Sequence, residues 1–190
     1  MTPGCRGAPP TDAMSGPKAG RLSRMDAVET LRLAQVRPLL RGRVLDVACG
    51  YNNLLRDHPG GVGADVHPWP GIDVVAEAGA LPFRAGSFDT VTVLAALNHF
   101  ADRPRALREI HDVLKPDGQL ILTMIGPLTG LVAHLLFRHD VHQRGEMAHE
   151  EKLGLTDREV RALLGATGYV LVRRWGFELG LNRVYVAVKA

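Results

Sequence analysis

The stretch of sequence that decides the fold is residues 44–53, which read Val44-Leu45-Asp46-Val47-Ala48-Cys49-Gly50-Tyr51-Asn52-Asn53. It begins as a short apolar run that contains one acid, and it continues into a loop with a single glycine. A short apolar run of this kind predicts a strand buried on both faces, as in parallel sheets. An acid near the end of such a strand, followed by a glycine loop, is typical of a ligand site in an open α/β sheet.

Strands and helices alternate along the chain on both sides of this stretch. Short apolar runs predict further strands at 62–66, 72–76, 88–94, 119–125, 169–175 and 184–188. Helical spacing predicts helices at 24–40, 53–58, 104–114 and 156–164, the last beginning at the capping box Thr156-Asp157-Arg158-Glu159. The predicted fold class is therefore α/β, with a doubly wound, mostly parallel Rossmann-like sheet of about seven strands and a C-terminal antiparallel hairpin.

The chain divides into a tail and one domain. Residues 1–22 are rich in Gly, Pro, Ala and Ser and lack apolar periodicity, so we expect a disordered tail. Residues 23–190 are expected to form the domain. Within it, residues 126–152 form a predicted substrate cap, because Leu128–Phe137 carries an apolar helical face. This apolar face also favours a hydrophobic acceptor.

Charge and cysteine content narrow the possible partners and location. The net charge is +3, but residues 1–25 account for all of it, with four basic side chains against one acid. Since the remainder is neutral, we expect no nucleic-acid partner. No run approaches the ~18 apolar residues of a spanning helix, so stable membrane insertion is not expected. Cys5 and Cys49 do not predict a disulfide, which favours a cytoplasmic location. The oligomeric state stays open.

The loop after Asp46 also discriminates between nucleoside cofactors. A dinucleotide needs a glycine-rich cradle for its pyrophosphate, and this loop holds Gly50 alone, followed by the bulkier Tyr51 and Asn52. S-adenosylmethionine has no phosphate and carries an ammonium and a sulfonium, which suit the acid at Asp46. Asp65, at the end of the second predicted strand, is placed to accept hydrogen bonds from a ribose diol.

Four sequence blocks together resemble the class I S-adenosylmethionine-dependent methyltransferases, in their small-molecule, type 11-like subgroup. The blocks are Val44–Gly50, Leu81–Val91, Leu97–Asp102 and Arg108–Leu120. The resemblance covers roughly 43–125 and implies a methyltransferase that takes S-adenosyl-L-methionine as cofactor and a small molecule as acceptor.

The resemblance also implies which residues bind the cofactor. These are Asp46, Ala48, Cys49, Gly50, Asp65, Val66, Glu77, Ala78, Leu94 and Ala95. Asp46 and the loop after it would line the methionine part, Asp65 would hold the ribose, and Val66 would lie against the adenine. Glu77 with Ala78 would meet the adenine amino group, and the last two residues would lie beneath the sulfonium.

Two positions depart from the family pattern. Asn52 stands where a second glycine is usual, although Asn adopts a left-handed backbone more readily than most residues. Glu77 replaces the commoner Asp and reaches one methylene further. The Phe88-Asp89 pair is expected to be structural.

His99 is the candidate catalytic residue, because its ordinary pKa near neutrality suits a general base for a hydroxyl or amine acceptor. The alternative is a packed or solvated loop histidine, since methyl transfer needs little beyond alignment. Four histidines between 134 and 149 do not form a tight ligand pair, so we predict no metal.

Two other functions stay open. One is a methyltransferase-like module that binds without catalysis, which the altered loop at Asn52 keeps in play. The other is a nicotinamide-dependent reductase, against which the missing glycines count.

Overall fold

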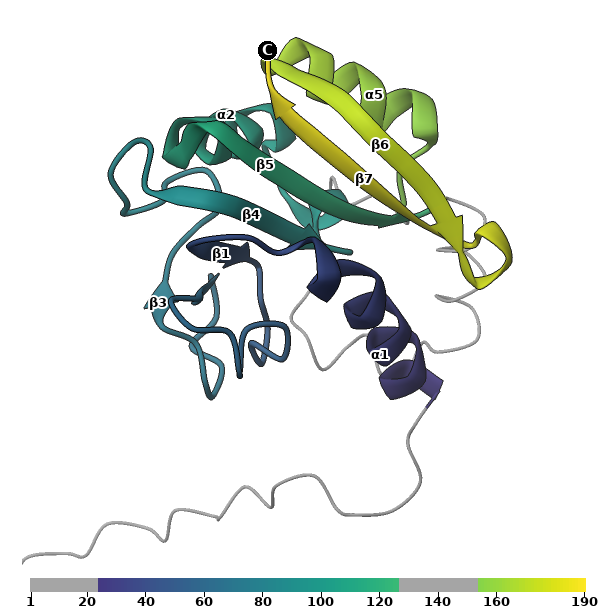
Figure 1. Ribbon diagram of the computed structural model, residues 1–190, viewed down its shortest axis with the longest axis horizontal. Coiled ribbons are helices and arrows are strands. Elements are labelled where there is room, and N and C mark those ends of the chain that lie inside the picture. The colour runs from purple at the N-terminus through teal and green to yellow at the C-terminus, as the bar shows by residue number, and fades with distance from the viewer. Residues whose placement is uncertain (1–23, 127–153) are drawn as a thin grey trace, which may run out of the picture.

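A seven-stranded sheet runs through the part of the chain that the structure, a computed structural model, describes: residues 24–126 and 154–190. The strand order is β3-β2-β1-β4-β5-β7-β6 (Figure 1), parallel except that β7 is antiparallel to both of its neighbours. The strands are β1 Val44–Val47, β2 Val62–Asp65, β3 Val74–Val75, β4 Phe88–Leu94, β5 Leu114–Ile125, β6 Tyr169–Phe177 and β7 Asn182–Lys189. The predicted fold class, including the C-terminal antiparallel hairpin, is confirmed.

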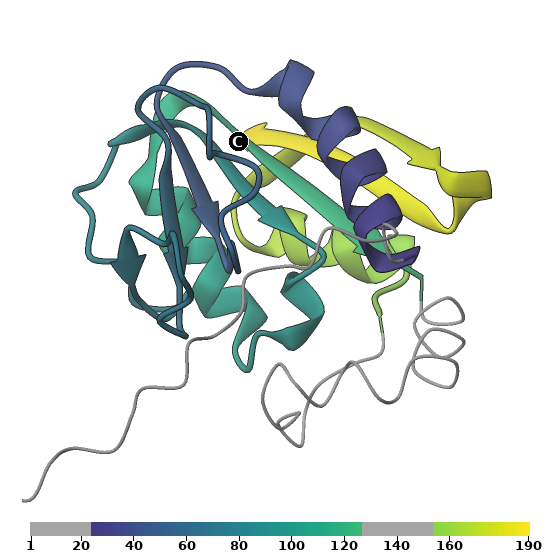
Figure 2. The ribbon, with the colours of Figure 1, turned by 90° about the horizontal axis from the view of Figure 1, so that it is seen from below.

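Helices cover both faces of this sheet. Helix α1 packs on one face, while α2 and α5 lie together on the other (Figure 2). Their bounds are α1 Arg24–Val36, α2 Arg103–Val113 and α5 Asp157–Ala166, with short 3-10 helices η1 Arg37–Leu39, η2 Leu97–His99 and η4 Glu178–Gly180. The capping box at Thr156 and Glu159 forms as predicted, with both reciprocal hydrogen bonds present.

Alternating side chains along the strands supply two hydrophobic cores. Leu45 and Val47 of β1 pack into the larger core, which α2 and α5 complete. Val44 packs into the smaller core on the α1 side, together with Leu54 and Leu55. Because side chains alternate along a strand, Asp46 shares the α1 face with Val44. A buried acid therefore stands on the more thinly covered face.

The strand order reverses at β1, which pairs with β2 on one side and β4 on the other. The crevice beyond the carboxyl ends of two strands at such a switch point is the usual ligand site of open α/β sheets. We call this side of the sheet the carboxyl edge. It receives the loops that follow β1, β2 and β4.

Two local predictions need correction. Residues 53–58 form turns, not a helix, because only a few residues separate the left-handed Asn52 from Pro59-Gly60 and so short a helix is not stable. The strand predicted at 119–125 begins earlier, at Leu114, directly after α2 ends at Val113. Leu114 already pairs with Phe88, and the register shifts before pairing resumes at Thr90.

The predicted disordered tail and substrate cap fall outside the described residues. No helix of 24–126 or 154–190 is long and apolar enough to cross a membrane.

Candidate functional site

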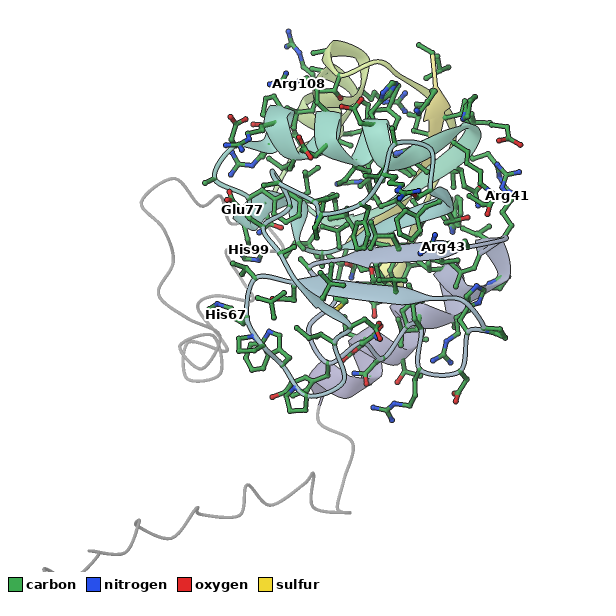
Figure 3. All side chains as sticks on the ribbon, turned by 90° about the vertical axis from the view of Figure 1, so that its left-hand side faces the viewer. Arg41, Arg43, His67, Glu77, His99 and Arg108 are labelled. Carbon is green, nitrogen blue, oxygen red and sulfur yellow. The ribbon has the colours of Figure 1, made fainter. Side chains whose placement is uncertain are left out.

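The predicted site residues gather at the carboxyl edge. Figure 3 shows Glu77, His99 and His67 along this edge, each from a loop that follows a different strand, whereas Arg41 and Arg43, which precede β1, lie at the opposite edge. Residues distant in sequence are thus brought to one side of the sheet by the parallel strands.

Asp46 is a buried acid with one direct partner. Its side chain is 3% exposed, and the Thr92 hydroxyl donates to its Oδ1 at 2.5 Å from the neighbouring strand β4. The pKa of Asp46 is raised to about 7. Burial is the largest cause and the charges of Asp65 and Glu29 act in the same direction, while the Thr92 hydrogen bond opposes them. Such a carboxyl favours a cationic ligand, because a positive charge would offset both the burial and the neighbouring acids.

The loop after β1 bends through three residues with positive φ. These are Ala48 at 58°, Gly50 at 54° and Asn52 at 54°. Asn52 therefore adopts the left-handed backbone expected of it in place of glycine. Its side chain also anchors the loop, since Nδ2 donates to the Gly71 carbonyl at 3.1 Å and to Asp73 Oδ2 at 3.3 Å.

Asn52 and Gly63 fit together in a way that explains both residues. A Cβ at Gly63 would lie 2.6 Å from Cγ of Asn52, so β2 needs a glycine where this side chain packs. Asp73 completes the contact by accepting from the Gly63 N–H at 2.7 Å. The departure from the family pattern is thus compensated by hydrogen bonds that a glycine at position 52 would not make.

Asp65 joins the first loop to the second. It is 7% exposed at the end of β2; its Oδ2 accepts from the Gly50 N–H at 2.9 Å, and its Oδ1 accepts from the His67 N–H at 3.0 Å. Each carboxylate oxygen has a further lone-pair site, so both can still accept a ribose hydroxyl. Val66, which follows directly, is 59% exposed and leaves an apolar surface for a base.

The remaining cofactor candidates line the same edge. Glu77, exposed, and the half-buried Ala78 follow β3, whose next residue Ala76 donates to the Asp65 carbonyl at 2.9 Å. Leu94 ends β4, and Ala95 follows with φ 53°. The Ala95 N–H is held by the Thr123 hydroxyl and carbonyl, both at 3.0 Å, which fixes this left-handed residue beside β5.

Cys49 and His99 differ in reactivity. Burial raises the pKa of the Cys49 thiol to about 12, with Asp46 and Asp65 adding to the shift, so the thiol stays neutral and is no nucleophile. His99 is exposed at the end of η2, with its Nε2 at 3.1 Å from Asn98 Nδ2. It lies at the carboxyl edge, in the segment that follows β4, and its catalytic role stays a prediction.

Sequence patterns gave no sign of several residues around the site. Thr92 looked like an ordinary strand residue, and Glu29 belongs to a helix with weak periodicity, yet both shift the pKa of Asp46.

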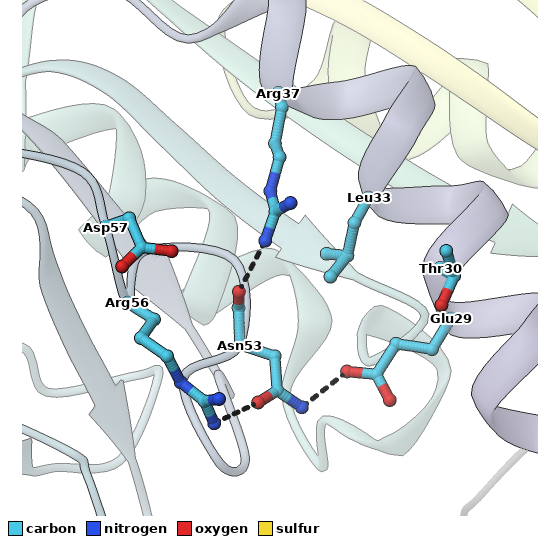
Figure 4. Close-up of a pocket in the computed structure, with 7 residues that line it drawn as sticks. All are labelled: Glu29, Thr30, Leu33, Arg37, Asn53, Arg56 and Asp57. Carbon is cyan, nitrogen blue, oxygen red and sulfur yellow. Dashed lines mark hydrogen bonds between the residues drawn. The ribbon is translucent and has the colours of Figure 1, made fainter. Parts of the chain in front are cut away.

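Glu29 also borders a polar cleft of about 260 Å³ between α1 and the loop after β1 (Figure 4). Its lining residues are Glu29, Thr30, Leu33, Arg37, Asn53, Arg56 and Asp57. Asn53 lies at its centre, bonded to Glu29, Arg37 and Arg56.

A second cleft, of about 690 Å³, lies where the N-terminal end of α2 meets α5. Most of its lining is apolar: Ala101, Pro104, Leu155, Ala162, Leu163 and Ala166, with Asp102, Arg103 and Glu159 at its polar side. Across the two described ranges, no group of three or more His, Cys, Asp or Glu residues has the arrangement of a metal site.

Comparison with known proteins agrees with this geometry. Residues 45–122 match the family model described as a methyltransferase domain. The demethylmenaquinone methyltransferase of Thermus thermophilus is 35% identical over 120 residues, which are 50% of this chain and 54% of that protein. Human mitochondrial arginine-hydroxylase NDUFAF5 is 44% identical over 57 residues, 30% of this chain and 16% of that protein. The chain therefore matches about half, or less, of the length of these curated relatives.

Solved structures share the fold at low sequence identity. The PH0226 protein of Pyrococcus horikoshii has a TM-score of 0.65 at 20% identity, covering 88% of this chain and 92% of that one. The [4+2]-cyclase SpnF has a TM-score of 0.65 at 17% identity, covering 90% and 84%. The sheet order and the acids at the strand ends define a class I methyltransferase fold. Over residues 45–122 the chain is similar to this methyltransferase family, and its fold is the one that solved S-adenosylmethionine-dependent methyltransferases share.

Proposed function

We propose that the protein transfers the methyl group of S-adenosylmethionine to a small-molecule acceptor. The observation that carries this proposal is the meeting of two buried acids, Asp46 and Asp65, at one left-handed loop beyond the switch point of the sheet. The residues present fit the cofactor: the site has a buried carboxyl for its ammonium and free carboxylate lone pairs for its ribose, and its loop lacks the glycine-rich cradle that a pyrophosphate would need.

Each residue then has a defined task. Asp46 pairs with the ammonium, Asp65 accepts from the two ribose hydroxyls, and Val66 packs against the adenine. Glu77, with Ala78, faces the adenine amino group, and the loop at Ala48, Cys49 and Gly50 lets the backbone approach the methionine part. Leu94 and Ala95 bound the space beneath the reacting centre. The bound cofactor supplies a methyl group on a sulfonium, which is a good leaving group, so alignment provides most of the catalysis.

His99 is proposed as a general base for an acceptor whose nucleophile carries a proton. Its exposed imidazole would take the proton from a hydroxyl or amine as the acceptor atom attacks the methyl carbon. Where the nucleophile is already anionic, this base is not needed.

The acceptor is proposed to be a small molecule with an apolar part. The apolar lining of the 690 Å³ cleft near η2 supports this, as the volume lies within the usual range for small-molecule sites. Demethylmenaquinone and ubiquinone/menaquinone methyltransferases among the relatives support the same class.

The test is transfer of labelled methyl groups from S-adenosylmethionine to a panel of phenols, hydroquinones and amines, with and without alkyl tails. We expect turnover on an apolar acceptor and a large loss for Asp65→Ala through weaker cofactor binding. Binding of S-adenosylhomocysteine without turnover on any acceptor would favour a second candidate, a module that binds the nucleoside without transferring methyl. The fold permits other chemistry, as the names of the hydroxylase and cyclase relatives show.

A further inference from the structure

The β6–β7 hairpin ends in a turn that presents exposed leucines. We call residues 178–181 the hairpin tip. Leu179 is 103% exposed and Leu181 is 50% exposed, so both side chains are open to solvent. The hairpin tip ends at Asn182, which pairs with Ile125, the last residue of β5. The tip therefore projects from the carboxyl edge of the sheet.

The backbone of the hairpin tip is unfavourable for the leucine that it carries. Three successive residues have positive φ, namely Glu178 at 49°, Leu179 at 57° and Gly180 at 83°. Glycine adopts this left-handed backbone readily, whereas a residue with a large side chain does not. Asn or Gly at position 179 would fit the turn better and would expose no apolar side chain. A leucine at this place points to a use for its exposed side chain.

The base of the hairpin is fixed against α1. Trp175 Nε1 donates to Gln35 Oε1 at 3.0 Å, and the Trp175 and Phe177 side chains pack against the smaller core. Leu31, one turn before Gln35 on the same side of α1, is 50% exposed. The N-terminal end of α1 and the hairpin tip lie at the same end of the molecule in both ribbon views (Figure 1, Figure 2). Leu31 therefore extends the apolar surface of the tip.

Basic side chains flank the hairpin tip on both strands. Arg173 is exposed on β6, with its guanidinium over the Trp175 ring at 5.2 Å from the centroid. Arg183 is half-buried near the start of β7. Glu178 is the only acid of β6, β7 and the tip, and its carboxylate accepts from Asn182 Nδ2. The hairpin is thus apolar at its tip and positively charged at its base.

This combination fits the surface of a lipid bilayer. Apolar side chains on a projecting turn can enter the boundary between headgroups and acyl chains, and arginines behind them can contact anionic headgroups. We propose that the hairpin tip inserts Leu179 and Leu181 into the surface of an anionic bilayer, with Arg173 and Arg183 on the lipid phosphates. The binding is peripheral and reversible, because the apolar contact and the basic contact are each weak alone.

Docking through the hairpin tip turns the carboxyl edge of the sheet toward the lipid. The loops that follow β1, β2 and β4 open at this same edge. The proposal goes beyond the proposed function and does not depend on it. Where both hold, an apolar acceptor can reach the carboxyl edge from the membrane without its apolar part crossing water.

Sedimentation of the full chain with lipid vesicles tests the proposal. One set of vesicles is phosphatidylcholine alone, and the other has equal parts of phosphatidylcholine and phosphatidylglycerol. The main variant is Leu179→Asn, which removes the apolar side chain and suits a left-handed backbone, so the fold should be kept. The matched control is Val170→Ser, because Val170 is 51% exposed on β6 but lies at the end of the strand away from the tip.

We expect the wild-type chain to bind the anionic vesicles and to bind phosphatidylcholine only weakly. Leu179→Asn should weaken binding to the anionic vesicles about tenfold, because burial of one leucine is worth roughly this factor. Leu179→Phe keeps an apolar side chain and should bind like wild type, as should Val170→Ser. Arg183→Gln should weaken binding to the anionic vesicles by about fivefold and leave the weak binding to phosphatidylcholine unchanged.

Two results would overturn the proposal. One is a wild-type chain that sediments with neither set of vesicles; if that chain self-associates and Leu179→Asn does not, the tip is an interface between two copies. The other is equal binding of the anionic vesicles by Leu179→Asn and wild type, which would assign lipid binding to another part of the chain, such as the basic residues 1–25. Titration with S-adenosylhomocysteine tests the proposed function separately, and Leu179→Asn should bind it like wild type.

Discussion

Asp46→Asn should stabilise the ligand-free protein at alkaline pH while damaging the cofactor site. The substitution keeps the shape of the side chain and an oxygen that can still accept from the Thr92 hydroxyl, now at 2.5 Å. It removes the charge. In the ligand-free protein no cation offsets the buried charge of Asp46, so its ionised form destabilises the fold. This destabilisation depends on pH because the carboxyl titrates.

The sign follows from the pKa of Asp46, which burial raises from 3.8 to about 7. Between these two pKa values the folded chain binds a proton on Asp46 that the unfolded chain has lost, so raising the pH favours unfolding. The stabilisation from the protonated Asp46 is therefore fully present at low pH and is lost as pH rises through about 7. At about 1.4 kcal/mol per pKa unit, wild-type protein should lose roughly 2–3 kcal/mol between pH 5 and pH 8 from this group alone.

Urea denaturation of both proteins at pH 5 and pH 8 measures the difference. We expect the free energy of unfolding of Asp46→Asn minus that of wild type to be about 2–3 kcal/mol larger at pH 8 than at pH 5, which means that the variant gains relative stability. A difference between variant and wild type that is the same at both pH values would refute the reasoning, because Asp46 would then not titrate in this range.

Three further predictions address the rest of the fold. The pKa of Asp89 is lowered, mainly by its hydrogen bond with Lys115, so the charged carboxylate stabilises the fold above the unfolded pKa and this contribution is lost as pH falls. Asp89→Asn should therefore destabilise the protein by about 1 kcal/mol at pH 8 and by less at pH 4 in urea denaturation. Equal losses at the two pH values would count against the ion pair. Asn52→Ala should destabilise more than Asn52→Gly, by about 1 kcal/mol in thermal melts, because both lose the side-chain hydrogen bonds but only alanine is strained at φ 54°; the reverse order would show that this backbone is unstrained. Thr156→Ala should cost about 0.5–2 kcal/mol by removing the cap of α5, and a neutral result would mean that the capping box adds nothing.

Most of the fold could be predicted because local signals and tertiary structure agree. The apolar run at 44–47, the alternation that follows and the capping box at Thr156 each point to the element that forms. The exception, at 53–58, failed because Leu54 and Leu55 are buried by turns, and burial of adjacent apolar residues imitates a helical pattern when read from sequence alone.

The candidate site was predictable only where a strand end carries a distinctive residue. Asp46, Gly50 and Asp65 stand at such ends, and the parallel sheet brings them together without further information. Thr92 and Glu29 act on Asp46 through strand pairing and helix packing, which sequence spacing does not encode. The fit of Asn52 against Gly63 is likewise a product of three-dimensional packing between two loops.

The measurement that tests the central claim most directly is calorimetric titration of the protein with S-adenosylhomocysteine at pH 8, where Asp46 is charged. The account predicts one molecule bound per chain, and weakening by about 1–3 kcal/mol in Asp65→Ala, whose carboxylate would otherwise hold the ribose. Absence of binding at millimolar concentration, or binding that Asp65→Ala leaves unchanged, would contradict it.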